Sequence, residues 1–137
     1  MTRYLLDTNI VSDLMRSPSS PALARLEEVG EDQVYVSIVV AGELRFGAQK
    51  KRSPRLFRDV EDTLGRLALV ALSPPVEERY ADLRAELERR GTPIGANDLW
   101  IAAQALQDGS VLVTDNVSEF SRVPGLTVEN WLQPQAR

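Results

Sequence analysis

The architecture of this chain begins at residues 3–9, Arg3-Tyr4-Leu5-Leu6-Asp7-Thr8-Asn9, where an apolar run ends in an acid and two helix-capping residues. This pattern predicts a buried strand at 3–7 and a helix at 9–15. Similar apolar runs predict strands at 33–37, 69–72 and 111–114, and a fifth if residues 126–128 join the sheet. Periodic apolar spacing predicts helices at 21–30, 38–49, 54–66, 76–90 and 97–107. Strands that alternate with helices indicate one α/β domain, with a central parallel sheet of four to five strands flanked by helices.

Four carboxylates stand at the ends of these predicted elements. Asp7 and Asp115 end two apolar runs, Glu43 follows a third, and Asp98 opens an amphipathic helix. In a parallel sheet such positions converge on one edge, outside the carboxyl ends of the strands. Acids that share an edge repel one another unless a cation neutralises them. The pattern therefore predicts a hard divalent metal and metal-assisted phosphate chemistry.

Each acid alone has a simpler explanation, such as a helix cap, a surface helix residue or a turn. Only the joint pattern favours a site. Short polar side chains lie near the same strand ends and could orient the carboxylates or a metal-bound water: Thr8, Asn9, Ser37, Thr114 and Asn116. Serine and threonine after a strand are more often plain helix caps.

The composition narrows the chemistry. With 137 residues, 43% of them apolar, the chain can bury the core of one domain. It contains no histidine and no cysteine, which excludes a Ser-His-Asp triad, a histidine-based ribonuclease, thiolate metal sites and disulfides. Carboxylates together with a metal-bound water are then the simplest source of a general base.

The net charge of −4 argues against a protein that coats nucleic acid non-specifically. Any contact with nucleic acid must be local, and residues 45–58 could supply it through Arg45, Lys50, Lys51, Arg52, Arg55 and Arg58. A solvated helix end and loop explains these charges equally well. The first residues lack the apolar core of a signal peptide and no run is long enough to span a bilayer, so we expect a cytoplasmic protein.

The motifs around the acids resemble those of PIN domains, and in particular those of the VapC toxins. Leu6-Asp7-Thr8-Asn9 resembles the opening PIN motif, and so does Ser37 ahead of Glu43-Leu44-Arg45-Phe46-Gly47-Ala48. Two later stretches are similar to the third and fourth acidic motifs, Pro93-Ile94-Gly95-Ala96-Asn97-Asp98-Leu99-Trp100-Ile101-Ala102-Ala103 and Val113-Thr114-Asp115-Asn116-Val117-Ser118-Glu119-Phe120. The close of the chain, from Val123-Pro124-Gly125-Leu126 to Glu129-Asn130-Trp131, also resembles VapC C-termini. Each motif is weak alone, but four in order at these spacings are specific.

The resemblance implies a single PIN-like domain over residues 1–137. It implies a Mg²⁺-dependent endoribonuclease, with Mn²⁺ as a substitute, that acts on structured RNA of the tRNA or rRNA class as the toxin of a type II toxin–antitoxin pair. It also implies a VapB-type antitoxin whose C-terminal segment fills the acidic groove, and a toxin homodimer. By this match Asp7, Glu43 and Asp98 take metal-binding and catalytic positions.

The fourth acidic position departs from the family pattern. Family members often carry the acid two residues after the threonine, where this chain has Asn116. We predict Asp115 as the fourth ligand, with the Asn116 carbonyl or Glu119 as alternatives.

Two other functions share some of these features. A phosphoacceptor domain also places an aspartate after its first strand, but it needs a lysine near a late strand end, whereas the only lysines are Lys50 and Lys51 in mid-chain. A non-catalytic interaction module would keep the fold without the metal, but all the acids needed for catalysis are present. A DNA-directed metal nuclease is a narrower alternative that only substrate assays can separate.

Overall fold

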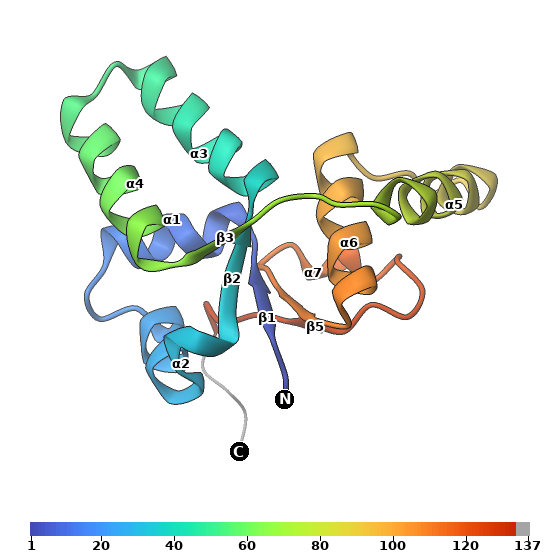
Figure 1. The fold of residues 1–137 in the computed structure, drawn as a ribbon, viewed down its shortest axis with the longest axis horizontal. Coiled ribbons are helices and arrows are strands. Elements are labelled where there is room, and N and C mark those ends of the chain that lie inside the picture. Colours follow the sequence, from blue (N-terminus) through green and yellow to red (C-terminus); the bar gives the residue numbers. More distant parts are fainter. Residues whose placement is uncertain (134–137) are drawn as a thin grey trace.

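The computed structural model describes residues 1–133, which form one parallel five-stranded sheet with helices around it (Figure 1). The strand order is β3-β2-β1-β4-β5, and every neighbouring pair is parallel. The strands are β1 (Tyr4–Leu6), β2 (Val34–Ser37), β3 (Ala68–Val70), β4 (Val111–Val113) and β5 (Val128–Glu129). The predicted α/β class and parallel sheet are confirmed, with five strands in the described part of the chain.

Helices cover the sheet in two groups. Within residues 1–133 the α-helices are α1 (Thr8–Arg16), α2 (Pro21–Val29), α3 (Ile38–Lys51), α4 (Pro54–Arg66), α5 (Val76–Arg89), α6 (Ala96–Asp108) and α7 (Val117–Phe120), with a 3-10 turn at Glu31–Gln33. In Figure 1, α1, α3 and α4 pack together to one side of the strands, and α5 and α6 pack together on the other. No described helix is both long and apolar enough to cross a membrane.

The observed elements differ from the predicted ones mainly around β3, β5 and α7. The third strand ends at Val70 rather than at residue 72, because its partner β2 ends opposite it at Ser37, where α3 begins. The carbonyl oxygen of Ala71 instead lies 3.4 Å from the side-chain amide of Gln104. The fifth strand begins at Val128, later than predicted. Helix α7 was not predicted, because it is too short to show a helical period.

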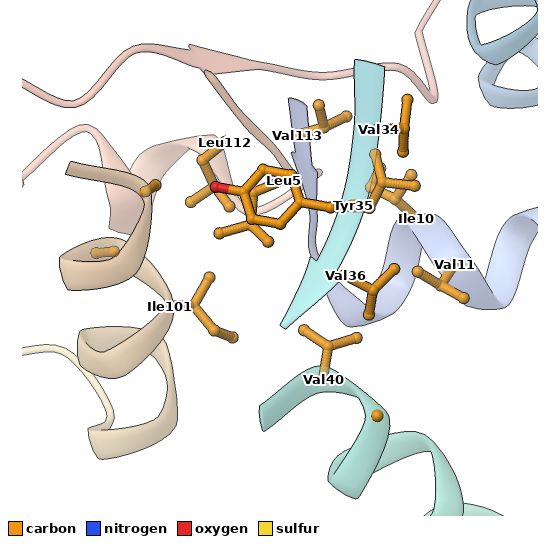
Figure 2. Close-up of a cluster of buried hydrophobic side chains, with 14 of the residues drawn as sticks. Leu5, Ile10, Val11, Val34, Tyr35, Val36, Val40, Ile101, Leu112 and Val113 are labelled. Carbon is orange, nitrogen blue, oxygen red and sulfur yellow. The ribbon is translucent and has the colours of Figure 1, made fainter. Parts of the chain in front are cut away.

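The core lies on both faces of the sheet. Figure 2 shows Leu5, Tyr35 and Leu112 from three adjacent strands, with side chains of α1, α3 and α6 around them. Strands β2 and β4 are buried along their whole length, which explains why their sequences show no polar alternation. This packing holds three strand ends in fixed positions at one edge of the sheet.

Trp131 anchors the end of the described chain. Its side chain is 1% exposed, its ring centroid lies 5.3 Å from that of Tyr4, and its Nε1 donates to Glu129 Oε1 at 3.0 Å. We expect Trp131→Ala to lower the free energy of unfolding by about 3–5 kcal/mol, because it leaves a large cavity in the core. Urea denaturation would measure the loss. Trp100→Ala is the control, since Trp100 is only half-buried and stacks on Tyr80; equal losses in both variants would contradict the anchoring role.

Candidate functional site

The carboxyl ends of β1, β2 and β4 meet at one edge of the sheet, where α1 and α3 begin. Asp7 follows β1, Ser37 ends β2 and Thr114 follows β4. Asp98 lies in the first turn of α6, near enough to Asp7 and to Glu43 on α3 for their charges to raise its pKa. The structure thus places Asp98 within charge range of Asp7 and Glu43, acids that lie far apart in the sequence.

Asp7 is the most buried of these acids, at 7% exposed. Its Oδ1 accepts the Thr8 backbone N–H at 2.8 Å, and its Oδ2 accepts the Thr114 hydroxyl at 2.7 Å. Burial raises the pKa of Asp7, the charges of Glu43 and Asp115 raise it further, and the two hydrogen bonds oppose the rise. The cap of α1 is Asp7 itself, so the prediction of a cap at Thr8 and Asn9 was wrong: Thr8 is already the first helical residue.

Glu43 is held by donors from two other helices. Its Oε1 accepts the Thr8 hydroxyl at 2.7 Å, and its Oε2 lies 3.4 Å from the Asn97 side-chain amide. Thr8 therefore joins α1 to α3, and Asn97 joins α6 to α3. This contact of Asn97 was not predicted from the sequence. Its only sequence signal is its place directly before Asp98, where it resembles a helix cap, whereas the observed cap of α6 is Gly95.

Asp98 has the most perturbed carboxyl of the site. Burial raises the pKa of Asp98 to about 7, and the charge of Glu119 adds to the rise. A hydrogen bond that protonated Asp98 makes with Glu119, and the charges of Asp7 and Glu43, act in the same direction. A proton or a cation is therefore needed to hold these groups together near neutral pH.

The two candidate fourth acids act on different members of this cluster, because the charge of Asp115 raises the pKa of Asp7 and that of Glu119 raises the pKa of Asp98. Asp115 is exposed, and its Oδ1 accepts the Asn9 side-chain amide at 3.0 Å. Glu119, on α7, faces Asp98, and its Oε1 accepts the Gly95 backbone N–H at 3.3 Å. The Asn116 side-chain amide donates to the other Glu119 oxygen, so the nitrogen of Asn116 points at a carboxylate. The position of Glu119 beside Asp98 could not be read from strand ends alone.

Most of the short polar side chains named from the sequence contact these acids. Thr8, Asn9, Thr114 and Asn116 each donate to a carboxylate of the cluster. The Thr114 hydroxyl also accepts the Asn116 backbone N–H at 3.0 Å. Ser37 is the exception, because its Oγ accepts the Val39 backbone N–H at 3.1 Å and so caps α3.

The donor set has the chemistry of a hard-cation site. The available ligands are carboxylate oxygens, which Mg²⁺ and Mn²⁺ prefer. Among residues 1–133, no three acidic side chains converge closely enough to ligate one ion together. Neutral hydroxyl and amide groups donate hydrogen bonds to Glu43 and Glu119. Charges of neighbouring acids raise the pKa of Asp7 and of Asp98, and no salt bridge within residues 1–133 involves an acid of this cluster, so a divalent ion fits their charge.

The basic residues of the predicted nucleic-acid contact do not act as one group. Arg45 donates to both oxygens of Glu61, at 2.9 and 3.1 Å, and is neutralised there. Lys51 and Arg55 line a groove of about 420 Å³ that Thr8 and Glu43 also line. Arg52 and Arg58 border a different hollow beside Phe57. Lys50 is exposed and lines neither of these two.

Comparison with known proteins identifies relatives along almost the whole chain. Residues 4–126 match the PIN domain family. The chain is 37% identical over 133 residues to "Ribonuclease VapC2" of Haemophilus influenzae, covering 96% of this chain and 100% of that protein. It is 33% identical to the "tRNA(fMet)-specific endonuclease VapC" of Salmonella typhimurium, covering 96% and 99%. The toxin-like chain in a crystal structure of VapBC2 from Rickettsia felis, bound to a DNA fragment from its promoter, superposes with a TM-score of 0.87 at 34% identity, covering 95% of this chain and 99% of that one.

Proposed function

Because the chain belongs to the PIN-domain family, as a VapC ribonuclease of the VapBC toxin–antitoxin systems, we propose that it is a Mg²⁺-dependent endoribonuclease that hydrolyses structured RNA of the tRNA or rRNA class. The observation that carries this proposal is a half-buried carboxyl set among other acids: burial raises the pKa of Asp98 to about 7, and the charges of Glu119, Asp7 and Glu43 add to the rise. Acids forced together at strand ends, with no cation among the side chains that perturb them, are suited to binding a divalent metal.

Asp7, Glu43, Asp98 and Asp115 are the residues that would hold the metal. When bound, a divalent ion activates a water and stabilises charge on a phosphodiester. The protein's own contribution is orientation: Thr114 and the Thr8 backbone fix the carboxylate of Asp7 through one oxygen each. Thr8 and Asn97 do the same for Glu43. Such outer contacts typically change metal affinity or activity by about 10–100-fold when removed.

RNA cleavage tests this proposal directly. Wild type and Asp7→Asn would be incubated with total RNA and with structured RNA, in Mg²⁺ or in EDTA. Discrete products from the wild type alone, and only with metal, are the expected result. Absence of products together with calorimetric Mn²⁺ binding would indicate a narrower substrate. Absence of both would favour the non-catalytic interaction module.

The fourth acid can be identified by comparing Asp115→Asn, Glu119→Gln and the double variant. We expect Asp115→Asn to lower kcat by about 10–100-fold if Asp115 contributes a metal ligand. Glu119→Gln removes the charge that faces Asp98, so its effect reports on that pair. Cleavage kinetics at saturating Mg²⁺ would measure both. A wild-type rate for Asp115→Asn with a large loss for Glu119→Gln would transfer the fourth position to Glu119.

The proposed partner is a VapB-type antitoxin whose C-terminal segment covers the acidic groove. Support comes from the solved relatives, which are VapBC assemblies. We also propose a toxin homodimer in the cytoplasm. Exposed apolar side chains could serve its interface, including Phe46 at 65% and Phe57 at 45% exposure. The phosphoacceptor alternative loses support, because Lys50 and Lys51 lie at the end of α3 that is remote from the strand ends.

A further inference from the structure

The groove that leads away from the acids carries charges of both signs. Thr8 and Glu43 line it together with three cations, Arg16 from α1, Lys51 from α3 and Arg55 from α4. We propose that this groove binds the sugar-phosphate backbone of the substrate RNA beside the scissile bond, with Arg16, Lys51 and Arg55 contacting phosphates. This inference rests on the proposed ribonuclease function and specifies how its substrate lies.

One face of α3 sets the direction of the groove. Glu43, Gly47 and Lys51 are spaced by four residues, so they lie along the same side of the helix and all line the groove. The rise of an α-helix places Lys51 about 12 Å from Glu43 along the axis. At that separation the lysine cannot neutralise the acid site, and it is positioned for a phosphate farther along the strand.

The three cations are available for a ligand. Arg16 and Lys51 form no ion pair with any of residues 1–133, and Arg55 has only a 4.0 Å contact with Asp59 while its side chain is 88% exposed. The acids that line the groove are Glu43, which we assign to the metal, and Asp59. The three cations outnumber these two acids, and a metal that neutralises Glu43 would increase the positive excess along the groove, which favours a polyanion as its occupant.

Gly47 keeps the passage open between the acidic and basic parts of the groove. A Cβ added at this position would meet no atom within 4 Å, so the missing side chain leaves space rather than relieving a clash. Gly47 is half-exposed and lines the groove. A larger residue here would fill the groove without disturbing the core.

Binding measurements in the inactive Asp98→Asn background test the cations without cleavage. The probe is fluorescein-labelled bulk tRNA, followed by anisotropy at several KCl concentrations. The variant carries Arg16→Gln, Lys51→Gln and Arg55→Gln. Its control carries Arg79→Gln and Arg89→Gln on α5 and Arg90→Gln at the C-cap of that helix. We expect the slope of log affinity against log salt to fall by about 2 in the groove variant, at about 0.7–0.9 per lost phosphate contact. The control should keep the parent's slope.

A blocking substitution tests the path itself. Gly47→Gln in the active enzyme should raise KM for RNA at least about tenfold while leaving the melting temperature equal or higher, since glycine is unfavourable within a helix. Gly65→Gln is the matched control, because an added Cβ at Gly65 also meets no atom within 4 Å and Gly65 does not line the groove.

Each other outcome overturns the inference in a recognisable way. If wild type cleaves RNA but the groove variants bind and cleave like their controls, the backbone follows another path while the ribonuclease function stands. If those variants still cleave RNA and lose only the ability to bind a co-expressed VapB-type antitoxin, the groove binds the protein partner. If wild type neither binds nor cleaves any RNA, the proposed function itself is wrong.

Discussion

Asp98→Asn is expected to abolish RNA cleavage, with a loss of at least about a thousandfold, or about 4 kcal/mol of transition-state stabilisation. The substitution keeps the size of the side chain but removes the charge that is crowded against Glu119, Asp7 and Glu43. A neutral amide cannot replace a carboxylate in neutralising a divalent ion. Rates on structured RNA at saturating Mg²⁺, compared with wild type under the same conditions, would measure the loss.

A matched control separates this effect from the loss of one negative charge anywhere on the protein. Asp82→Asn removes one acid from α5, where the side chain is exposed and makes no ion pair with the described residues. We expect it to cleave at the wild-type rate. Asp98→Asn should retain a cooperative thermal transition, because the group it replaces is only half-buried at the start of α6. A near-wild-type rate for Asp98→Asn would remove this residue from the catalytic site.

The sequence predicted the part of the site whose residues are positioned by the beginnings and ends of helices and strands. Apolar runs identify β1, β2 and β4. Asp7 directly follows β1, Glu43 lies in the helix that follows β2 and Asp98 lies in the first turn of α6, so the parallel topology brings them toward one edge. The buried hydroxyl of Thr114 could also be anticipated, because it directly follows β4. These positions depend on where an element begins or ends, which the hydrophobic pattern determines.

The contacts that were missed depend on how helices pack. Asn97 reaches Glu43 only because the start of α6 lies against α3, and neither helix contains a signal for that approach. Glu119 belongs to α7, which is too short for a helical period to reveal. The basic stretch shows the same limit. Arg45 and Lys51 lie on one helix but point to different neighbours, Glu61 and the groove.

The thermal stability of the protein should depend on divalent metal, and melting experiments can measure this dependence without any RNA substrate. In EDTA the acids repel one another, and Asp98 has a pKa of about 7 in the folded protein, against the ordinary aspartate value of 3.8. The folded state therefore binds a proton between about pH 4 and 7 that the unfolded state releases, so wild-type stability falls as the pH rises through this range. Asp98→Asn lacks this group. We expect it to melt at the same temperature as wild type near pH 4 and a few degrees higher above pH 7, because solvent screens a half-exposed carboxyl.

Mn²⁺ should reverse this order of melting temperatures, so that wild type melts above Asp98→Asn. At a concentration about 100 times its Kd, an ion that binds only the folded state adds about 2.7 kcal/mol, which is roughly 10 °C in a domain of this size. Wild type should gain this stabilisation at pH 7.5, whereas Asp98→Asn should gain little, because one ligand charge is absent. Differential scanning fluorimetry in EDTA and in Mn²⁺, with Asp82→Asn as the control, would measure both effects. An equal rise in melting temperature for wild type and Asp98→Asn would mean that the ion binds elsewhere. Only a site that includes Asp98 makes wild type the less stable protein in EDTA and the more stable one in Mn²⁺.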